Sequence, residues 1–289
     1  MKNRLHDVLA VIPLCDEGKI VLKQAMYLQK ALSFRIFALY VVSPVSPFRR
    51  LFCSRKISVI KEEAKQKLND FLLDFYEGEI PANVIPRVSM GKLVPNLIRQ
   101  GRSDNYFFMI LKRSNKGDPT LLNQNKIDKI IGHSYCPVLS IHEDPTPEII
   151  RKILIPIDIS ESTSKKLLWA SLFAKKTNAI IQIVSALKIN IDKQKSLALK
   201  NAEKIKAMLR GRGIECQVEI LKAFHHAQHK LVLDYISTQK PDMVIIRKHN
   251  VASKMNTTVG DFAKEIIHGS TVPVFTVSQS QSDIADTLG

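Results

Sequence analysis

Two short basic segments each follow an apolar, strand-like run, and their residue types could bind an anion. Residues 112–115 are Lys-Arg-Ser-Asn and residues 247–250 are Arg-Lys-His-Asn, so both segments have the pattern basic-basic-x-Asn. Ammonium and guanidinium groups donate charge-assisted hydrogen bonds to anionic oxygens. One interpretation is a cationic pocket with Arg247 and Lys248 as donors. The alternative is side chains that extend into solvent from a strand end.

Three histidines of the second half, His225, His226 and His229, form the only histidine cluster in the sequence. His225 and His229 are four residues apart, which is a spacing that metal ligands use on a helix. No glutamate completes a His-Glu-x-x-His motif, and tetrahedral zinc would need ligands from elsewhere. We therefore expect no metal site here, but an exposed helix end that carries imidazoles.

Residues 48–56 combine two phenylalanines with four cations, which are Arg49, Arg50, Arg55 and Lys56. Cations interleaved with aromatic rings are typical of nucleic-acid binding and equally of attachment to an anionic membrane surface. The third interpretation is an ordered loop whose aromatic rings dock on the other half of the chain.

Motifs of nucleophilic catalysis and of phosphate-binding loops are absent from the sequence. It contains neither Gly-x-Ser-x-Gly nor Gly-x-x-x-x-Gly-Lys-Ser/Thr. The acidic pairs Asp16-Glu17 and Glu62-Glu63 resemble solvated helix faces. We therefore predict that the protein is not an enzyme.

Strand-like and helix-like segments alternate along the whole chain. In the first half we predict strands at 7–13, 35–42, 83–89, 106–111 and 138–142, with helices at 18–32, 57–77, 92–101 and 120–133. In the second half we predict strands at 152–157, 179–185, 214–221, 242–247 and 273–278, with helices at 162–176, 191–210, 226–239 and 259–268. This alternation predicts parallel sheets with helices on both faces, and ligand sites just after strands one and four of each half.

The chain also repeats itself. Residues 7–13 correspond to 152–158, and residues 130–138 correspond to 266–274. A period this long indicates a duplicated domain rather than a solenoid. We predict domains at 1–144 and 150–280, followed by a polar tail at 281–289.

Composition and charge fit two globular domains. Hydrophobic residues make up 45% of the 289 residues, and the net charge of +16 is divided evenly between the halves. This basic excess suggests an anionic partner such as a nucleotide, a nucleic acid or an acidic lipid, with solubility as the alternative explanation. The apolar runs are too short to span a membrane, no signal peptide is apparent, and the four scattered cysteines suggest a reducing compartment, so we expect a cytoplasmic protein.

The chain resembles the universal stress protein family, in its tandem form. Residues 156–161, Pro-Ile-Asp-Ile-Ser-Glu, are similar to the opening strand-Pro-x-Asp-x-Ser-Glu of that family, and 127–138 and 263–274 to its closing helix and Pro-Val strand. The resemblance implies two doubly wound open parallel sheets of the adenine nucleotide alpha hydrolase-like type. It also implies the strand order 3-2-1-4-5 and a pseudo-dimer formed through the last strands.

The resemblance also implies a nucleotide site in the second half, although the motif is altered. Nucleotide-binding members have Gly-x-x-Gly after strand four and Gly-Ser/Thr nine residues later, because glycines let backbone amides approach phosphates. Here the glycines are replaced by Arg247 and Asn250, and Asp261 follows the retained Gly260. The structural interpretation of Asp261 is a helix N-cap. The candidate site comprises Asp158, Ser160, Arg247, Lys248, Asn250, Gly260 and Asp261.

The first half departs further from the family motif. Lys112 and Asn115 replace the loop glycines, Gln124-Asn125 replaces the last pair, and Leu14 stands in place of the aspartate. We therefore expect no ATP binding of the family type in this half.

Three functions remain open. The leading one is a non-catalytic, ligand-responsive stress-response protein that acts through an unknown protein partner or as a homodimer. The second is an ATP- or ADP-binding protein that uses Asp158 for the base and Arg247, Asn250 and the Gly260 amide for phosphates, with at most weak hydrolysis. The third is an RNA, DNA or lipid binder that uses residues 48–56.

Overall fold

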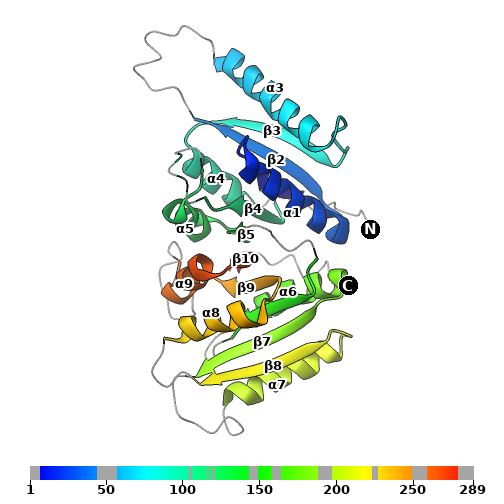
Figure 1. Cartoon of the computed structure of the whole chain (residues 1–289), viewed down its shortest axis with the longest axis vertical. Coiled ribbons are helices and arrows are strands. Elements are labelled where there is room, and N and C mark those ends of the chain that lie inside the picture. Colours follow the sequence, from blue (N-terminus) through cyan, green and yellow to red (C-terminus); the bar gives the residue numbers. More distant parts are fainter. Residues whose placement is uncertain are drawn as a thin grey trace. The chain divides into compact units, whose positions relative to one another are not determined.

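A computed structural model of the chain describes residues 7–43, 57–103, 106–114, 116, 118, 121–142, 149–157, 164–187, 197–222, 227–248 and 259–278. The chain divides into two compact units, Met1–Cys136 (unit 1) and Pro137–Gly289 (unit 2) (Figure 1). Of the residues singled out above, Asn115, Asp158, Ser160, His225, His226, Asn250, the basic loop 48–56 and the tail 281–289 lie outside the described residues.

Unit 1 has strands and helices in alternation along the chain. Its elements are β1 (Asp7–Val11), α1 (Asp16–Leu32), β2 (Arg35–Val42), α3 (Ile57–Phe75), β3 (Val84–Met90), α4 (Leu93–Arg102), β4 (Phe108–Lys112) and α5 (Gln124–His133). The strands are parallel and lie in the order β3-β2-β1-β4. The direction of winding therefore reverses between β1 and β4.

Unit 2 repeats this arrangement and includes the last strand of the first half. Its elements are β5 (Val138–Ile141), β6 (Lys152–Pro156), α6 (Ser164–Thr177), β7 (Ile180–Leu187), α7 (Leu197–Arg210), β8 (Cys216–Lys222), α8 (Gln228–Gln239), β9 (Met243–Arg247), α9 (Asp261–Gly269) and β10 (Val274–Val277). The order is β5-β10-β9-β6-β7-β8, and all neighbours are parallel except β5 and β10. The pairing of β5 with β10 explains why β5 groups with unit 2, before the predicted division at 144–150.

The predicted α/β class and the predicted parallel order are confirmed. In unit 2 the strands β8-β7-β6-β9-β10 are the predicted order 3-2-1-4-5. The described helices and strands fall within a few residues of their predicted bounds. The largest difference in unit 1 is α5, which begins at Gln124 rather than at residue 120, because the side chain of Asn123 caps the helix there.

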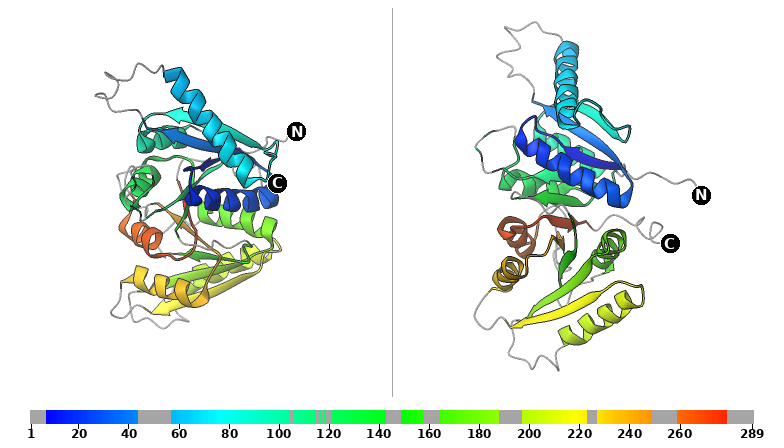
Figure 2. Two further views of the ribbon diagram at one scale, coloured as in Figure 1. Left: turned by 45° about the horizontal axis from the view of Figure 1, so that its top comes forward. Right: turned by 45° about the vertical axis from the view of Figure 1, so that its right-hand side comes forward.

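The helices lie on both faces of each sheet, as the connections require. A Cβ atom on Gly18 of α1 would contact Phe71 of α3, so these two helices share one face in unit 1, whereas α4 and α5 contact each other on the opposite face (Figure 2). In unit 2 the helices α8 and α9 contact each other in the same way.

Burial explains why these segments form these elements. In β1, residues 8–11 are at most 5% exposed, so this apolar run is covered on both faces. Helix α3 buries Ala64, Leu68 and Leu72, which recur at four-residue spacing on one face. In unit 2, Trp169 of α6 lies 4.8 Å from Phe275 of β10, measured between ring centroids.

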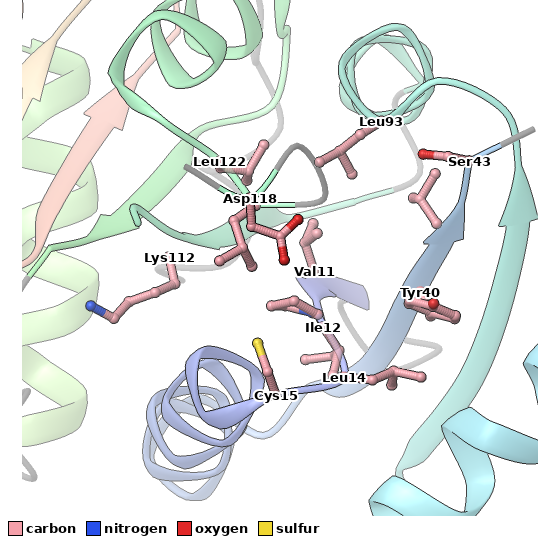
Figure 3. A pocket seen from close by; sticks show the side chains of 13 residues that line it. Val11, Ile12, Leu14, Cys15, Tyr40, Ser43, Leu93, Lys112, Asp118 and Leu122 are labelled. Atoms are coloured by element: carbon pink, nitrogen blue, oxygen red, sulfur yellow. The ribbon is translucent and has the colours of Figure 1, made fainter. Parts of the chain in front are cut away.

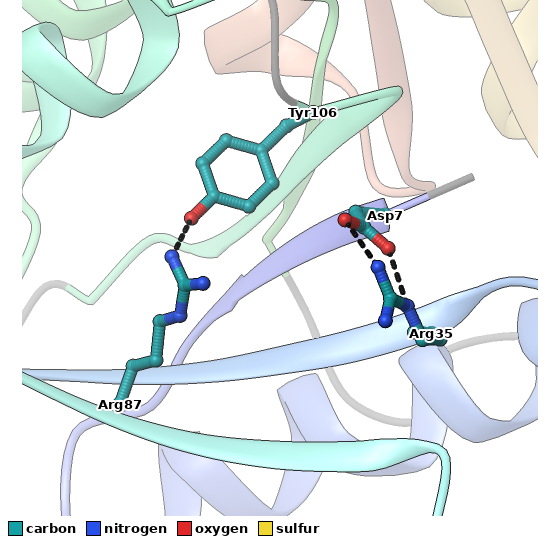
Figure 4. A network of polar contacts seen from close by, with 4 residues as sticks. All are labelled: Asp7, Arg35, Arg87 and Tyr106. Atoms are coloured by element: carbon teal, nitrogen blue, oxygen red, sulfur yellow. Dashed lines mark hydrogen bonds and ion pairs between the residues drawn. The ribbon is translucent and has the colours of Figure 1, made fainter. Parts of the chain in front are cut away.

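A polar network closes the amino-terminal end of the sheet in unit 1 (Figure 4). Arg35 at the start of β2 donates two hydrogen bonds to Asp7, its register partner at the start of β1. Arg87 donates to the Tyr106 hydroxyl at 2.9 Å and lies 4.1 Å from the ring centroid of Phe37. The guanidinium groups of Arg35 and Arg87 both lie over the ring of Phe37.

No helix in the described part of the chain is long and apolar enough to cross a lipid bilayer.

Candidate functional site

A cavity of about 200 Å³ lies at the carboxyl ends of the strands in unit 1 (Figure 3). It is bordered by the ends of β1, β2 and β4, by the start of α4 and by the segment that leads into α5. Its lining consists of Val11, Ile12, Pro13, Leu14, Cys15, Tyr40, Val41, Ser43, Leu93, Lys112, Asp118, Leu121 and Leu122. In open α/β sheets, ligands bind at this end of the strands, where the strand order reverses.

The walls of the cavity are mainly aliphatic, with a few polar groups. The polar groups are the Cys15 thiol, the Tyr40 and Ser43 hydroxyls and the Asp118 carboxylate. Lys112 also borders the cavity, but its amine extends away from the other labelled side chains (Figure 3). An apolar cavity with few convergent polar groups is typical of a small-molecule site.

Glu17 lies directly behind the Cys15 wall and joins α1 to the segment after β4. Its carboxylate accepts a hydrogen bond from the Cys15 thiol at 2.9 Å and pairs with the Lys116 ammonium at 2.9 Å. The hydroxyl of Ser114 also donates to it at 3.5 Å. The side chain of Glu17 is 10% exposed, whereas that of Lys116 is 70% exposed. The expectation that Asp16-Glu17 forms a solvated helix face is therefore wrong for Glu17.

These contacts determine the protonation of both groups. The hydrogen bonds from Cys15 and then Lys116 lower the pKa of Glu17 to about 2, because they stabilise the carboxylate. Burial, and then the neighbouring Glu17, raise the pKa of the Cys15 thiol. At neutral pH the pair is therefore a thiol that donates a hydrogen bond to a carboxylate.

Gly18 allows this arrangement. A Cβ atom at this position would collide with the carbonyl oxygen of Pro13 and would also press on Ile12 and Phe71. The first turn of α1 therefore lies directly against the end of β1, and this close approach puts Glu17 beside the cavity.

The strand registers show which residue of unit 1 corresponds to Asp158. Val11 pairs with Leu39 in unit 1 as Pro156 pairs with Val184 in unit 2. The following amides, of Ile12 and Ile157, donate to the carbonyls of those same partners. The next residue is Pro13 in unit 1 and Asp158 in unit 2, so the assignment of Leu14 to this position is wrong by one residue.

In unit 2 the equivalent strand end carries cations. The registers match Lys112 with Arg247, as the sequence predicts, because Phe108 pairs with Val8 and Met243 with Ile153. The pKa of Lys165, in the first turn of α6, is lowered by burial and then by the nearby charge of Arg247. The neighbouring Lys166 is 2% exposed and donates to the carbonyl of Pro156 at 2.7 Å.

Sequence reasoning did not identify Lys165 and Lys166. One signal was available, because two lysines in the first turn of a helix oppose the helix dipole and need a separate explanation. Glu17 had a comparable signal, since it follows the end of the first strand, where ligand sites of such sheets lie.

The start of α9 differs from its prediction. Gly260 is the N-cap, and Asp261 is the first helical residue, so the interpretation of Asp261 as the N-cap is wrong. Asp261 still favours the helix electrostatically, since a carboxylate in the first turn interacts well with the dipole. The Gly260 amide donates a hydrogen bond to the Lys248 carbonyl at 2.8 Å. The sequence analysis had proposed this same amide as a donor to phosphate.

The structure brings together only part of the predicted site of unit 2. Arg247, Lys248, Gly260 and Asp261 are described, and Lys248 and Gly260 are in contact. Among the described residues, which include His229, no group of three or more His, Cys, Asp or Glu side chains is arranged to hold a metal ion.

Both units have the open, doubly wound α/β fold, and comparison with known protein families gives a match in the second half of the chain. Residues 150–278 match the model of the Universal stress protein family. The chain therefore carries a universal stress protein domain in its second half. No curated protein sequence matches the chain.

Solved structures show the same fold over nearly the whole chain. A universal stress protein from Archaeoglobus fulgidus DSM 4304 has a TM-score of 0.73 and 21% identity, covering 96% of this chain and 99% of that chain. A functionally unknown protein from Pseudomonas aeruginosa PAO1 has a TM-score of 0.65 and 17% identity, and the match covers 99% of this chain and 96% of that chain. The cytoplasmic domain of a prokaryotic cation chloride cotransporter has a TM-score of 0.54 and 12% identity, and the match covers 98% of this chain and 99% of that chain.

Proposed function

We propose that this protein is a non-catalytic, ligand-responsive stress-response protein that takes a small molecule into the cavity of unit 1. The observation that carries the proposal is the position of the cavity, at the carboxyl ends of β1 and β4 where the strand order reverses. The family domain in unit 2 supports a stress-related role.

The chemistry of the cavity wall favours binding over catalysis. The neighbour of the Cys15 thiol is Glu17, whose pKa is about 2. A carboxylate with so low a pKa is a poor general base for a thiol whose own pKa is raised. The described groups therefore form a stable wall rather than an activated nucleophile.

A ligand in this cavity would connect elements that are far apart in sequence. Leu93 begins α4, whereas Asp118, Leu121 and Leu122 belong to the segment between β4 and α5. Occupancy would hold these two segments against the ends of β1 and β2. The surface near them would then differ between the free and the bound protein, which is how a ligand could control an interaction with a partner.

The test is a thermal-shift screen of small neutral and charged molecules on three proteins. Leu93→Trp fills the cavity mouth, and Leu73→Trp is the matched control on α3, where Leu73 is 38% exposed. A ligand of the cavity should raise the melting temperature of the wild type and of Leu73→Trp but not that of Leu93→Trp. An equal shift in all three proteins would contradict the proposed site.

A second candidate function is binding of an adenine nucleotide in unit 2. It is favoured by the proximity of Lys165 and Arg247, because an anion between two cations would relieve their repulsion. ATP should then stabilise the wild type, and Arg247→Ala and Asp158→Ala should lose this effect. Arg212→Ala, at an exposed site of the same unit, is the control, and an equal ATP shift in all four proteins would exclude the assignment.

A further inference from the structure

We propose that helix α7 of unit 2 attaches the protein to an anionic lipid bilayer through a row of exposed cations and one exposed methionine. This surface, the basic row, comprises Lys200, Lys204, Met208 and Arg212. It belongs neither to the cavity of unit 1 nor to the cationic end of β9, so the inference goes beyond the proposed function and does not depend on it.

Helix α7 lies at the margin of unit 2. It contacts β8 and β7, and β8 is the last strand in the order of the sheet, with β7 as its neighbour (Figure 1). Ala202 and Leu209 are fully buried on the inner face of the helix, and Leu199 packs against Ile220 of β8. The opposite face of α7 is therefore directed outward.

The basic row runs along this outward face. Lys200, Lys204 and Met208 follow one another at four-residue spacing, so they lie on one side of the helix. Met208 is 39% exposed, which is unusual for a large apolar side chain in this protein. Arg212 is exposed in the turn that directly follows the helix. Because these side chains are long and lie in a row, they can reach one flat surface together.

The fold does not use the charge of these cations. The one acidic residue of α7, Glu203, pairs with Lys206 at 3.4 Å. In the part of the chain that the structure describes, no carboxylate pairs with Lys200, Lys204 or Arg212. Lys200 also lies in the first turn of α7, where a cation opposes the helix dipole and no acidic residue compensates it. These charges are therefore available to a partner.

The equivalent helix of unit 1 lacks this surface. Helix α3 contacts β3 and β2 as α7 contacts β8 and β7. It has three lysines and four acidic residues, whereas α7 has four cations and one glutamate. Lys65 of α3 also pairs with Glu62 at 3.9 Å. A basic excess that served solubility alone has no reason to differ between the two helices, so its concentration on α7 favours an anionic partner there.

The composition of the basic row favours a bilayer over a nucleic acid. Residues 197–213 contain no aromatic residue on which a base could stack. Met208 lies between Lys204 and Arg212 in the row, and an apolar side chain among cations can enter the headgroup region of a bilayer. A phosphate backbone would gain nothing from this methionine. Clusters of four or more cations on a helix are typical of binding to anionic lipids, and Arg210 is the fourth exposed cation here.

The expected affinity is modest, and binding should be reversible. Each cation near an anionic membrane raises the affinity by about fivefold, so four cations give half-maximal binding on the order of 1 mM lipid. The attraction acts between exposed charges, so salt should weaken it strongly.

The experiment is co-sedimentation of the full chain with lipid vesicles, at low and at high salt. The vesicles contain phosphatidylcholine alone, or phosphatidylcholine and phosphatidylglycerol at about two to one. The variant of the basic row carries Lys200→Gln, Lys204→Gln and Arg212→Gln. The matched control on α3 carries Lys61→Gln, Lys65→Gln and Lys67→Gln. Both proteins lose three positive charges at exposed positions, so their net charges are equal.

We expect the wild type to sediment with the anionic vesicles at low salt, and not with phosphatidylcholine alone. The variant of the basic row should bind on the order of a hundredfold more weakly, while the α3 control should stay within about threefold of the wild type. All substituted side chains are exposed, so the melting temperatures should change by no more than about 2 °C. An equal loss in both variants would overturn the proposal, because net charge alone would then explain the binding. Wild-type binding by the variant of the basic row would overturn it as well.

A second pair of variants separates a bilayer from a nucleic acid. Met208→Gln should weaken binding to anionic vesicles by about threefold, because the apolar contact is lost. Leu73→Gln on α3, where Leu73 is 38% exposed, is the control and should bind as the wild type does. Fluorescence anisotropy with duplex DNA and duplex RNA covers the other anionic partner. If the basic row is needed for a duplex while Met208→Gln binds vesicles as the wild type does, the partner is a phosphate backbone and the bilayer proposal is overturned.

Discussion

The carboxyl-terminal strand ends of the two units have the same topology but differ in the side chains around them. In unit 1 the end of β4 borders an apolar cavity, and Glu17 engages the nearby cation Lys116. In unit 2 the equivalent end of β9 carries Arg247, and burial and then the charge of Arg247 lower the pKa of Lys165 on α6. A cation at the end of unit 1 is therefore paired with an enclosed carboxylate, whereas in unit 2 two cations lie close enough to affect each other.

This difference teaches that the backbone of the fold supplies a place for a ligand, while a few side chains decide which ligand enters. The registers show that Lys112 and Arg247 occupy equivalent positions. Their surroundings differ because the first turn of α1 contains Asp16 and Glu17, whereas the first turn of α6 contains Lys165 and Lys166. The predictions below alter one end at a time.

The largest effect is expected for Gly18→Ala in unit 1. The new Cβ atom would collide with the Pro13 carbonyl oxygen, which belongs to the backbone and cannot move aside cheaply. We expect the free energy of unfolding to fall by about 3 kcal/mol, measured by urea denaturation. Gly211→Ala is the control, because its Cβ would make only ordinary contacts, at 3.5 Å and beyond. Equal losses in both variants would contradict this account of the α1 position.

Glu17→Gln should have the next largest effect, and the effect should depend on pH. The folded-state pKa of about 2 lies below the ordinary value of 4.5, so the ionised form stabilises the fold. We expect a loss of about 2 kcal/mol at pH 6, a value reduced for the solvent exposure of Lys116. The stabilisation is complete above pH 4.5 and disappears as the pH falls toward 2. Urea denaturation at pH 6 and pH 3 checks this, and a difference between the two proteins that stays constant with pH would refute it.

A smaller effect of opposite sign is expected for Lys165→Gln in unit 2. The lowered pKa of Lys165 means that its charge costs stability at neutral pH, and this cost disappears as the pH rises toward 10.5. Removal of the charge should stabilise the protein by no more than about 0.5 kcal/mol, as is usual for partly exposed charges. Phosphate should raise the melting temperature of the wild type more than that of the variant. If phosphate stabilises both equally, the cations of unit 2 do not form its binding site.

The smallest effect is expected for Arg35→Ala, at the opposite end of the sheet in unit 1. The side chain of Arg35 is 40% exposed, and exposed ion pairs contribute little to stability. We expect the melting temperature to change by no more than about 1 °C and the rate at which iodoacetamide alkylates Cys15 to stay unchanged. A change in this rate would mean that the two ends of the unit are coupled.

Much of the fold could be predicted because it depends on local patterns. The alternation of apolar runs with amphipathic segments predicted the strands and helices, and the repeated segments predicted the duplication. At the starts of α5 and α9 the N-cap decided the bound, and these caps are Asn123 and Gly260. These caps depend on which side chain or backbone group completes the first turn, and neighbouring residues of similar type compete for that position.

The candidate site was less predictable than the fold. The sequence pointed to Arg247 and Lys248 through a repeated pattern, but it did not reveal that the Gly260 amide is engaged by the Lys248 carbonyl. Nor did it show that Glu17 is enclosed, because an acidic pair at a helix start is usually solvated. The contact between Glu17 and Ser114 joins residues 97 positions apart.

The sequence by itself therefore determined the α/β class, the duplication and the ends of the strands where a ligand is expected, since these follow from periodic burial and from right-handed connections. Only the tertiary structure decided that unit 1 holds a cavity and that Glu17 lies beside it. The physical reason is that a cavity and an enclosed ion pair arise from residues that are distant in the chain. Their distances depend on how close α1 and the β4–α5 segment come to the sheet, and Gly18 allows the close approach of α1.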